Sequence, residues 1–221
     1  MFFLSGFDFF PIKLSLQVAL IATFFVVIIG TAFAYLLATK KFRGNTLLEV
    51  LITLPLILPP TVTGYYLILL FGRQGMIGKY FEWNLTFTWG AAVIASFVVA
   101  LPLMVRTTQA AIESVDRSMI NTSYMLGYGQ WQTAFKVIFP LAKKGLFAGA
   151  ILSFARAMGE FGATLMFAGN IPGRTNTMPL EIYSLASSGE WTKAHFLVLI
   201  LTLGSILILI LATKLAKKDW S

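Results

Sequence analysis

The chain has 221 residues, of which 57% are hydrophobic and 12% are charged. Soluble domains carry about 25% charged residues, so this composition excludes a soluble protein and indicates an integral membrane protein. The net charge of +8 does not indicate nucleic-acid binding, because the Lys and Arg residues cluster at the ends of apolar segments instead of forming one aromatic-interleaved face.

Several apolar segments are long enough for the ~20 residues that a membrane-spanning helix needs. They cover residues of about 14–38, 46–71, 86–105, 144–168 and 195–213. The sequence therefore predicts an all-α integral membrane protein with five transmembrane helices, in which residues 1–221 form a single domain. The first span lacks a basic leader and a small-residue cleavage site, so we expect it to be retained.

Lys and Arg are distributed unevenly between the two sets of connecting segments. One set contains Lys40, Lys41, Arg43, Arg106, Arg117, Lys136, Lys143, Lys144, Lys214, Lys217 and Lys218. The other contains Lys13, Arg73, Lys79, Arg174 and Lys193. Because cytoplasmic loops carry the excess of positive residues, we expect an N-terminus outside the cell and a cytoplasmic C-terminus.

The second apolar segment contains Pro55, Pro59 and Pro60. Each proline removes a backbone donor and clashes with the preceding turn, so an unbroken helix is not expected. A helix that restarts near Pro60 would direct free N–H groups near Thr61 and Thr63 into a cavity, where they favour anions. A kink that serves packing alone is the alternative.

The fourth apolar segment repeats small residues at every fourth position, namely Gly145, Gly149, Ser153 and Ala157. This spacing places them on one helix face and predicts close approach of another helix.

The same segment carries Arg156 and Glu160, one helical turn apart. Charges at this depth are costly and must face protein or a wet cavity. The pair could be a salt bridge that fixes packing, or Arg156 could line an anion path or gate. A proton relay is a third interpretation, disfavoured because further titratable partners are lacking.

The longest polar connection, residues 106–143, predicts two short amphipathic helices that form an elbow on the membrane surface. Asp116 and Ser118 are candidate starts of the first helix. Gly127 can end it in a left-handed turn, and Pro140 is expected to end the second.

On the opposite side, the segment that follows the fourth span is too long for a simple turn. Residues Pro179–Ala186 are expected to form a short helix that begins at Thr177 or Pro179 and could face an extracytoplasmic partner.

Motifs for catalysis and metal binding are missing from the sequence. It has no Cys, one His (His195), no Gly-rich phosphate loop and no Ser/His/Asp set. We therefore predict no catalytic, cofactor-binding or metal-binding residues, and no enzymatic activity in this chain alone.

The spacing of Gly127, Val137, Phe139 and Pro140 is similar to the EAA loop of ABC-importer permeases. The chain departs from that motif where the family usually has Glu, Ala and Ala, because these positions hold Asn121, Thr122 and Ser123. Three longer blocks, LPLILPPTVTGYYL, LPLMVRTTQAAIESVD and SFARAMGEFGATLMFAGNIPGRTNTMPLEIY, resemble the molybdate-type permease subunit of ABC importers, within the branch for sulfate, molybdate and tungstate.

This resemblance implies the type I permease fold of ABC importers and a homodimer in the cytoplasmic membrane of a prokaryote. It also implies a cytoplasmic ATPase partner that holds ATP and Mg, and an extracytoplasmic molybdate-binding protein. Alternating access would be coupled through loop 106–143. The residues implied for ATPase coupling are Asn121, Thr122, Ser123, Tyr124, Leu126, Gly127 and Pro140. Those assigned to the translocation path or gate are Pro59, Pro60, Thr61, Thr63, Ser153, Arg156 and Glu160.

Three alternatives remain. Tungstate or sulfate could be the transported anion within the same family. A secondary transporter or channel could use Arg156 and Glu160 for coupling, although such proteins normally contain internal repeats, which this sequence lacks. A membrane-embedded enzyme is disfavoured by the missing nucleophile and ligand clusters.

Overall fold

The computed structural model describes residues 8–81 and 85–217, and no strand occurs among them. The elements in chain order are α1 Phe10–Thr39, α2 Asn45–Ile57, α3 Pro60–Phe71, α4 Gly78–Phe81, α5 Trp89–Glu113, α6 Arg117–Met125, α7 Gln130–Thr133, the π-helical turn η1 Ala134–Ile138, α8 Phe139–Met158, α9 Gly162–Phe167, α10 Met178–Ser187 and α11 Trp191–Lys217.

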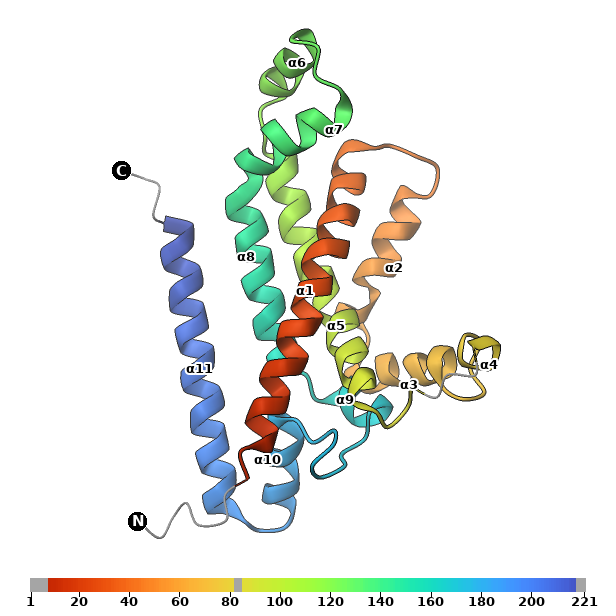
Figure 1. The fold of residues 1–221 in the computed structure, drawn as a ribbon, viewed down its shortest axis with the longest axis vertical. Coiled ribbons are helices and arrows are strands. Elements are labelled where there is room, and N and C mark those ends of the chain that lie inside the picture. The colour runs from red at the N-terminus through yellow and green to blue at the C-terminus, as the bar shows by residue number, and fades with distance from the viewer. Residues whose placement is uncertain (1–7, 82–84, 218–221) are drawn as a thin grey trace.

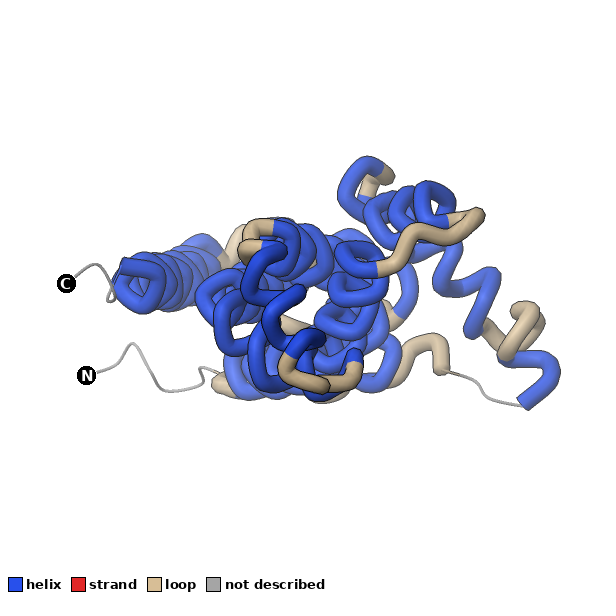
Figure 2. Tube along the Cα trace, turned by 90° about the horizontal axis from the view of Figure 1, so that it is seen from above, coloured by secondary structure: helices blue, strands red, loops and turns tan. Residues whose placement is uncertain are grey.

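Long apolar helices form the body of the molecule (Figure 1). Among the described residues, four helices are long and apolar enough to cross a membrane: Phe10–Thr39, Trp89–Glu113, Gln130–Met158 and Trp191–Leu211. Viewed from above, the last helix lies at one edge of the bundle beside the C-terminus (Figure 2). Because the outer surface of this helix is apolar and exposed, it suits contact with lipid or protein.

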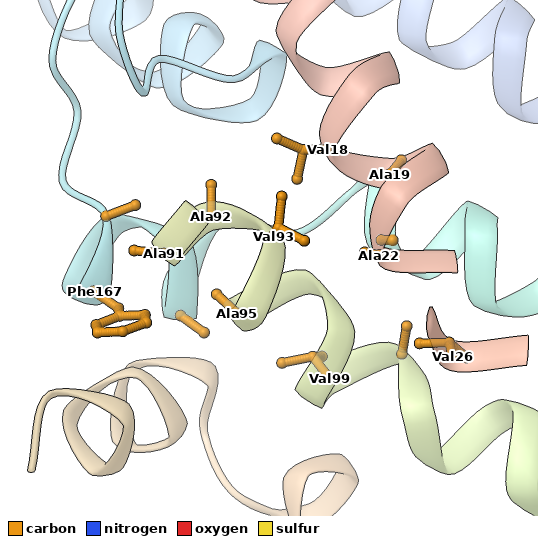
Figure 3. Close-up of a cluster of buried hydrophobic side chains, with 14 of the residues drawn as sticks. Val18, Ala19, Ala22, Val26, Ala91, Ala92, Val93, Ala95, Val99 and Phe167 are labelled. Atoms are coloured by element: carbon orange, nitrogen blue, oxygen red, sulfur yellow. The ribbon is translucent and has the colours of Figure 1, made fainter. Parts of the chain in front are cut away.

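The bundle core is built from small and β-branched side chains of α1 and α5. Val18 of α1 lies beside Val93 of α5 (Figure 3), and Ala22, Val26, Ala95 and Val99 belong to the same buried cluster. Such side chains let the two helices approach closely, as is common between membrane helices.

The small-residue face of α8 packs on α5, as the sequence predicts. A Cβ atom added to Gly145 would lie 2.1 Å from the Cβ atom of Ala111, and one added to Gly149 would lie 3.0 Å from the Sδ atom of Met104. Further along the same face, the buried hydroxyl of Ser153 donates to the carbonyl of Ala100 at 3.2 Å.

The segment expected to be one span at residues 46–71 is two helices. Pro55 is tolerated inside α2, whereas the helix ends at Leu58, which has φ −70° and ψ 143°. A residue that precedes proline avoids the helical region, so Pro59 sets the break, and Pro60 begins α3 as its first residue, where its missing N–H costs nothing. Figure 1 shows α3 running across the bundle instead of along it.

The segment expected to be one span at residues 144–168 is also interrupted. Helix α8 ends at Met158 with Gly159 as its cap, and α9 begins at Gly162. The prolines reveal the first break in the sequence, but no proline marks the second.

In the elbow, the first helix α6 begins and ends as expected. The carboxylate of Asp116 accepts a hydrogen bond from the Ser118 N–H at 2.8 Å, so Asp116 and not Ser118 is the cap. Gly127 has φ +83°. The Tyr128 N–H donates to the Ser123 carbonyl at 3.0 Å, which completes a left-handed C-terminal turn.

The expectation that Pro140 ends the second helix is wrong. Helix α7 continues through η1 into α8, and Pro140 lies in the first turn of α8. The Phe139 N–H donates to the Ala134 carbonyl, five residues back. This wider π turn accommodates a proline that would clash with the preceding carbonyl in a regular α-helix.

On the opposite end, α10 spans Met178–Ser187 with Thr177 as its N-cap, close to the expected Pro179–Ala186. The Met178 N–H donates to the buried hydroxyl of Ser15 at 2.7 Å, which attaches this segment to α1.

The contact between α5 and α8 gives a direct test with one pair of substitutions. Gly145→Ala places a methyl group against Ala111, whereas Gly204→Ala in α11 meets nothing within 4 Å. Both changes have the same intrinsic effect on helix formation, so overpacking should destabilise only the first, by about 1–3 kcal/mol. Thermal unfolding of the two purified variants in detergent measures the difference, and equal midpoints would contradict the packing described here.

Candidate functional site

The structure places the predicted functional residues in two separate regions. The coupling residues lie in the α6–α7 elbow at one end of the molecule (Figure 1). The residues assigned to a path or gate lie where α8 gives way to α9 and where α3 begins. Of the residues predicted for ATPase coupling, Pro140 alone lies outside the elbow, in the first turn of α8.

At the break between α8 and α9, Arg156 and Glu160 contact each other. Their Nη1 and Oε2 atoms are 2.7 Å apart, and the Oε2 atom has no hydrogen-bond partner among the described residues. The Glu160 side chain is 1% exposed and that of Arg156 is 30% exposed. The other Glu160 oxygen accepts a hydrogen bond from the Ala163 N–H at 2.9 Å. Glu160 thus joins the last turn of α8 to the first turn of α9.

The start of α3 packs directly on α9. A Cβ atom added to Gly64 would lie 2.6 Å from the Cβ atom of Met166, and one added to Gly162 would lie 2.7 Å from the Cβ atom of Pro60. Two interrupted segments, far apart in sequence, therefore meet at their break points through glycine. A side chain at either position would force α3 and α9 apart.

The residues assigned to the path differ in their accessibility. Pro59, Pro60 and Thr61 are exposed at the start of α3. Thr63 is buried, and its hydroxyl has no hydrogen-bond partner among the described residues. Ser153 is fully buried against α5 and its hydroxyl is already used. In this structure, therefore, Ser153 serves helix packing and does not line an accessible surface.

The elbow has a buried polar joint and an exposed apolar tip. Ser123 is buried, and its hydroxyl lies 2.9 Å from the hydroxyl of Thr133, which joins α6 to α7. At the tip, Met125 is 87% and Leu126 is 71% exposed, beside the exposed Tyr124. Exposed apolar side chains gathered in this way are typical of surfaces that contact protein or membrane. The sequence interpretation did not include Met125, although it occupies the last position of the amphipathic helix.

The other residues predicted for coupling, Asn121, Thr122 and Gly127, are exposed on the same elbow.

The hydrogen bond from the Ser118 backbone lowers the pKa of the Asp116 carboxyl group below its ordinary value of 3.8. The cap on α6 is therefore fully present above that value and is lost as the pH falls through the lowered pKa.

In the described part of the chain, no three His, Asp or Glu side chains come together as a metal ion would require. The titratable side chains at the break are the paired Arg156 and Glu160. Arg156 and Glu160 form an ion pair with compensated charge, which is not the arrangement of an activated nucleophile.

Comparison with known proteins agrees with this architecture. Residues 26–218 match the family model described as "Binding-protein-dependent transport system inner membrane component". The putative molybdenum transport system permease protein of Bacillus subtilis is 44% identical over 93% of both chains. The molybdenum transport system permease protein of Escherichia coli is 40% identical over 90% of both. The sulfate transport system permease protein of Escherichia coli is 33% identical over 89% of this chain and 72% of its own length.

Solved structures with low sequence identity share the fold. The inward-facing MetNI methionine ABC transporter aligns with a TM-score of 0.74 and 18% identity, over 94% of both chains. A bacterial ABC transporter for the import of alginate aligns with a TM-score of 0.79 and 12% identity, over 99% of this chain and 82% of its own. The family match begins at residue 26, within α1, and covers the remaining helices of the bundle, both breaks and the elbow. The chain therefore belongs to the binding-protein-dependent transport system inner membrane components, as a multi-pass permease of the ABC importer type and not its ATPase.

Proposed function

We propose that this chain is the membrane-spanning subunit of an ATP-driven importer for molybdate, with tungstate as a further substrate. The observation that carries this proposal is the 40–44% identity to molybdenum permeases over at least 90% of both chains, against 33% to the sulfate permease. In this proposal a cytoplasmic ATPase holds ATP and Mg, and an extracytoplasmic molybdate-binding protein delivers the anion. This chain contributes the path.

The proposed topology has five crossings, formed by α1, the α2–α3 pair, α5, α8 with its extension α9, and α11. The end of α1, the α6–α7 elbow and the end of α11 lie at one end of the molecule, and α10 lies at the other (Figure 1). The first end is rich in Lys and Arg, which supports a cytoplasmic location for the elbow and the C-terminus.

The elbow is the proposed contact with the ATPase. Its exposed Tyr124, Met125 and Leu126 offer an apolar surface, and the hydroxyl contact between Ser123 and Thr133 holds that surface in a fixed orientation. Because the chain after Thr133 is helical as far as Met158, a displacement of the elbow would be carried along η1 and α8 to the break at Gly159.

The proposed path runs between two copies of this chain, past the start of α3. Arg156 is the cation nearest to the break, and its contact with Glu160 leaves the pair with no net charge. A dianion would therefore meet donors and helix ends but no unpaired positive charge that holds it tightly. Weak binding of this kind favours release on the cytoplasmic side.

Transport itself tests the substrate and the energy source. Cells that lack their own permease would receive this chain with its ATPase and its binding protein, and uptake of radiolabelled molybdate would be measured. We expect uptake that requires the ATPase, competes with excess tungstate and resists excess sulfate. Abolition by sulfate would move the chain to the sulfate branch, and ATPase-independent uptake would indicate a secondary transporter.

The left-handed turn at Gly127 tests the role of the elbow. Gly127→Val forces a β-branched residue to φ +83°, which costs about 1–2 kcal/mol locally. Gly129→Val is the matched control, because Gly129 has φ −73° and nothing lies within 4 Å of either added Cβ atom. We expect weaker co-purification of the ATPase and lower uptake for Gly127→Val alone. Equal binding and uptake for both variants would contradict the proposal.

The pair Arg156 and Glu160 separates packing from transport. Arg156→Gln alone leaves the buried Glu160 charge unpaired, which costs about 3–5 kcal/mol. Adding Glu160→Gln removes that charge and keeps an oxygen acceptor for the Ala163 N–H. We expect the double variant to recover folded yield but not molybdate uptake. Recovery of both would mean that the pair serves packing alone.

A further inference from the structure

A cavity of about 690 Å³ lies where the end of α1 meets the elbow. This volume is within the range of small-molecule sites. Its wall includes the cations Lys40, Lys41 and Arg117, and no Asp or Glu lines it. These residues come from α6 and from the segment that follows α1, so the fold brings together charges that are far apart in the sequence.

The positive charges of this cavity have no acidic partner in the described part of the chain. The Lys40 ammonium donates to the Gln130 amide oxygen at 3.2 Å, which uses one of its three donors and neutralises none of its charge. The ion pairs of the described residues involve other cations. The Oδ1 atom of Asp116, next to Arg117, accepts the Ser118 N–H, and no ion pair joins this carboxylate to Arg117. Three like charges around one hollow repel each other, and an anion between them removes that cost.

Apolar and aromatic side chains also line the cavity, among them Tyr35, Ile120 and Ile138. The Tyr35 ring packs on two neighbours outside the lining: it stacks on Trp131 with ring centroids 6.3 Å apart and contacts Phe139 edge-on at 5.6 Å. A hollow that combines cations with apolar side chains, at the end of a membrane-spanning helix, is complementary to an amphiphile with a negative headgroup.

We propose that the cavity formed by Lys40, Lys41 and Arg117 binds a phosphoryl group, carried either by the headgroup of an anionic membrane lipid or by a soluble phosphate. The site shares Asn121 and Tyr124 with the elbow that is the proposed ATPase contact, and it is separate from the proposed transport path at α3 and α9. A bound phosphoryl group would connect the end of α1 to α6 and, through Lys40 and Gln130, to α7. It would thereby stabilise the elbow in the orientation seen here.

The lipid source is tested with the transporter assembled with its ATPase in nanodiscs. Bound phosphatidylglycerol would be counted by native mass spectrometry after reconstitution in phosphatidylcholine with and without phosphatidylglycerol. The test variant is Lys40→Gln, Lys41→Gln and Arg117→Gln together. The matched control is Arg43→Gln, Lys143→Gln and Lys214→Gln, which removes the same charge from exposed positions outside the cavity.

The soluble source is tested with radiolabelled inorganic phosphate and the same proteins in phosphatidylcholine alone. An ATPase has phosphate-binding loops of its own, so both variants are expected to bind some phosphate. The readout is therefore the difference in phosphate affinity between the cavity variant and the control variant. We expect one of the two ligands to lose at least about 10-fold in affinity in the cavity variant but not in the control. Loss for phosphatidylglycerol identifies a lipid site, and loss for inorganic phosphate identifies a soluble ligand. Equal binding of both ligands by the two variants would overturn the proposal.

Discussion

The structure depends on the rule that backbone polar groups within lipid must find partners inside the protein. An unbroken helix meets this rule by itself, but two segments of this chain are interrupted at membrane depth. Their break points meet, because Gly162 lets Pro60 approach and Gly64 lets α9 approach. Glu160 accepts the Ala163 N–H that α9 leaves free at its start. The two interruptions thus contact each other at one place in the fold.

This arrangement explains why a charged pair can lie within an apolar bundle. Glu160 is buried because it has two tasks, to contact Arg156 and to accept the Ala163 N–H. Arg156 remains partly accessible while its charge is compensated. The site is therefore polar but neutral, which suits a surface past which an anion moves without being retained. Packing and transport are not exclusive roles for this pair, and only a variant that repairs the packing can separate them.

Local signals in the sequence predicted much of this fold, and they failed where tertiary contacts decide. Residue type and spacing alone predict the cap at Asp116, the left-handed turn at Gly127 and the small-residue face from Gly145 to Ala157.

The prolines of the second segment predict that its helix is broken, but they do not show where. The helix tolerates Pro55 and breaks at Pro59. The break after Met158 had no such signal, because Gly159 is compatible with a helix until Glu160 and Gly162 find their partners. The expectation for Pro140 fails for the opposite reason. Here the sequence contains a helix-breaking residue, but the π turn η1 accommodates it within a continuous helix. The family resemblance assigns Ser153 to the path, yet its hydroxyl donates to the Ala100 carbonyl of α5.

The close contacts at Gly64 and Gly162 predict that α3 and α9 move as one unit when the proposed ATPase partner changes state. The chain contains no cysteine, so spin labels can be attached at single introduced cysteines without background. Tyr65 on α3 is exposed and Leu165 on α9 is half-buried, and neither side chain is the one that meets Gly64. Electron spin resonance on the assembled transporter, with and without ATP, should give a constant Tyr65–Leu165 distance within one copy and a changed Tyr65–Tyr65 distance between copies. A changed distance within the copy, or an unchanged distance between copies, would contradict the account.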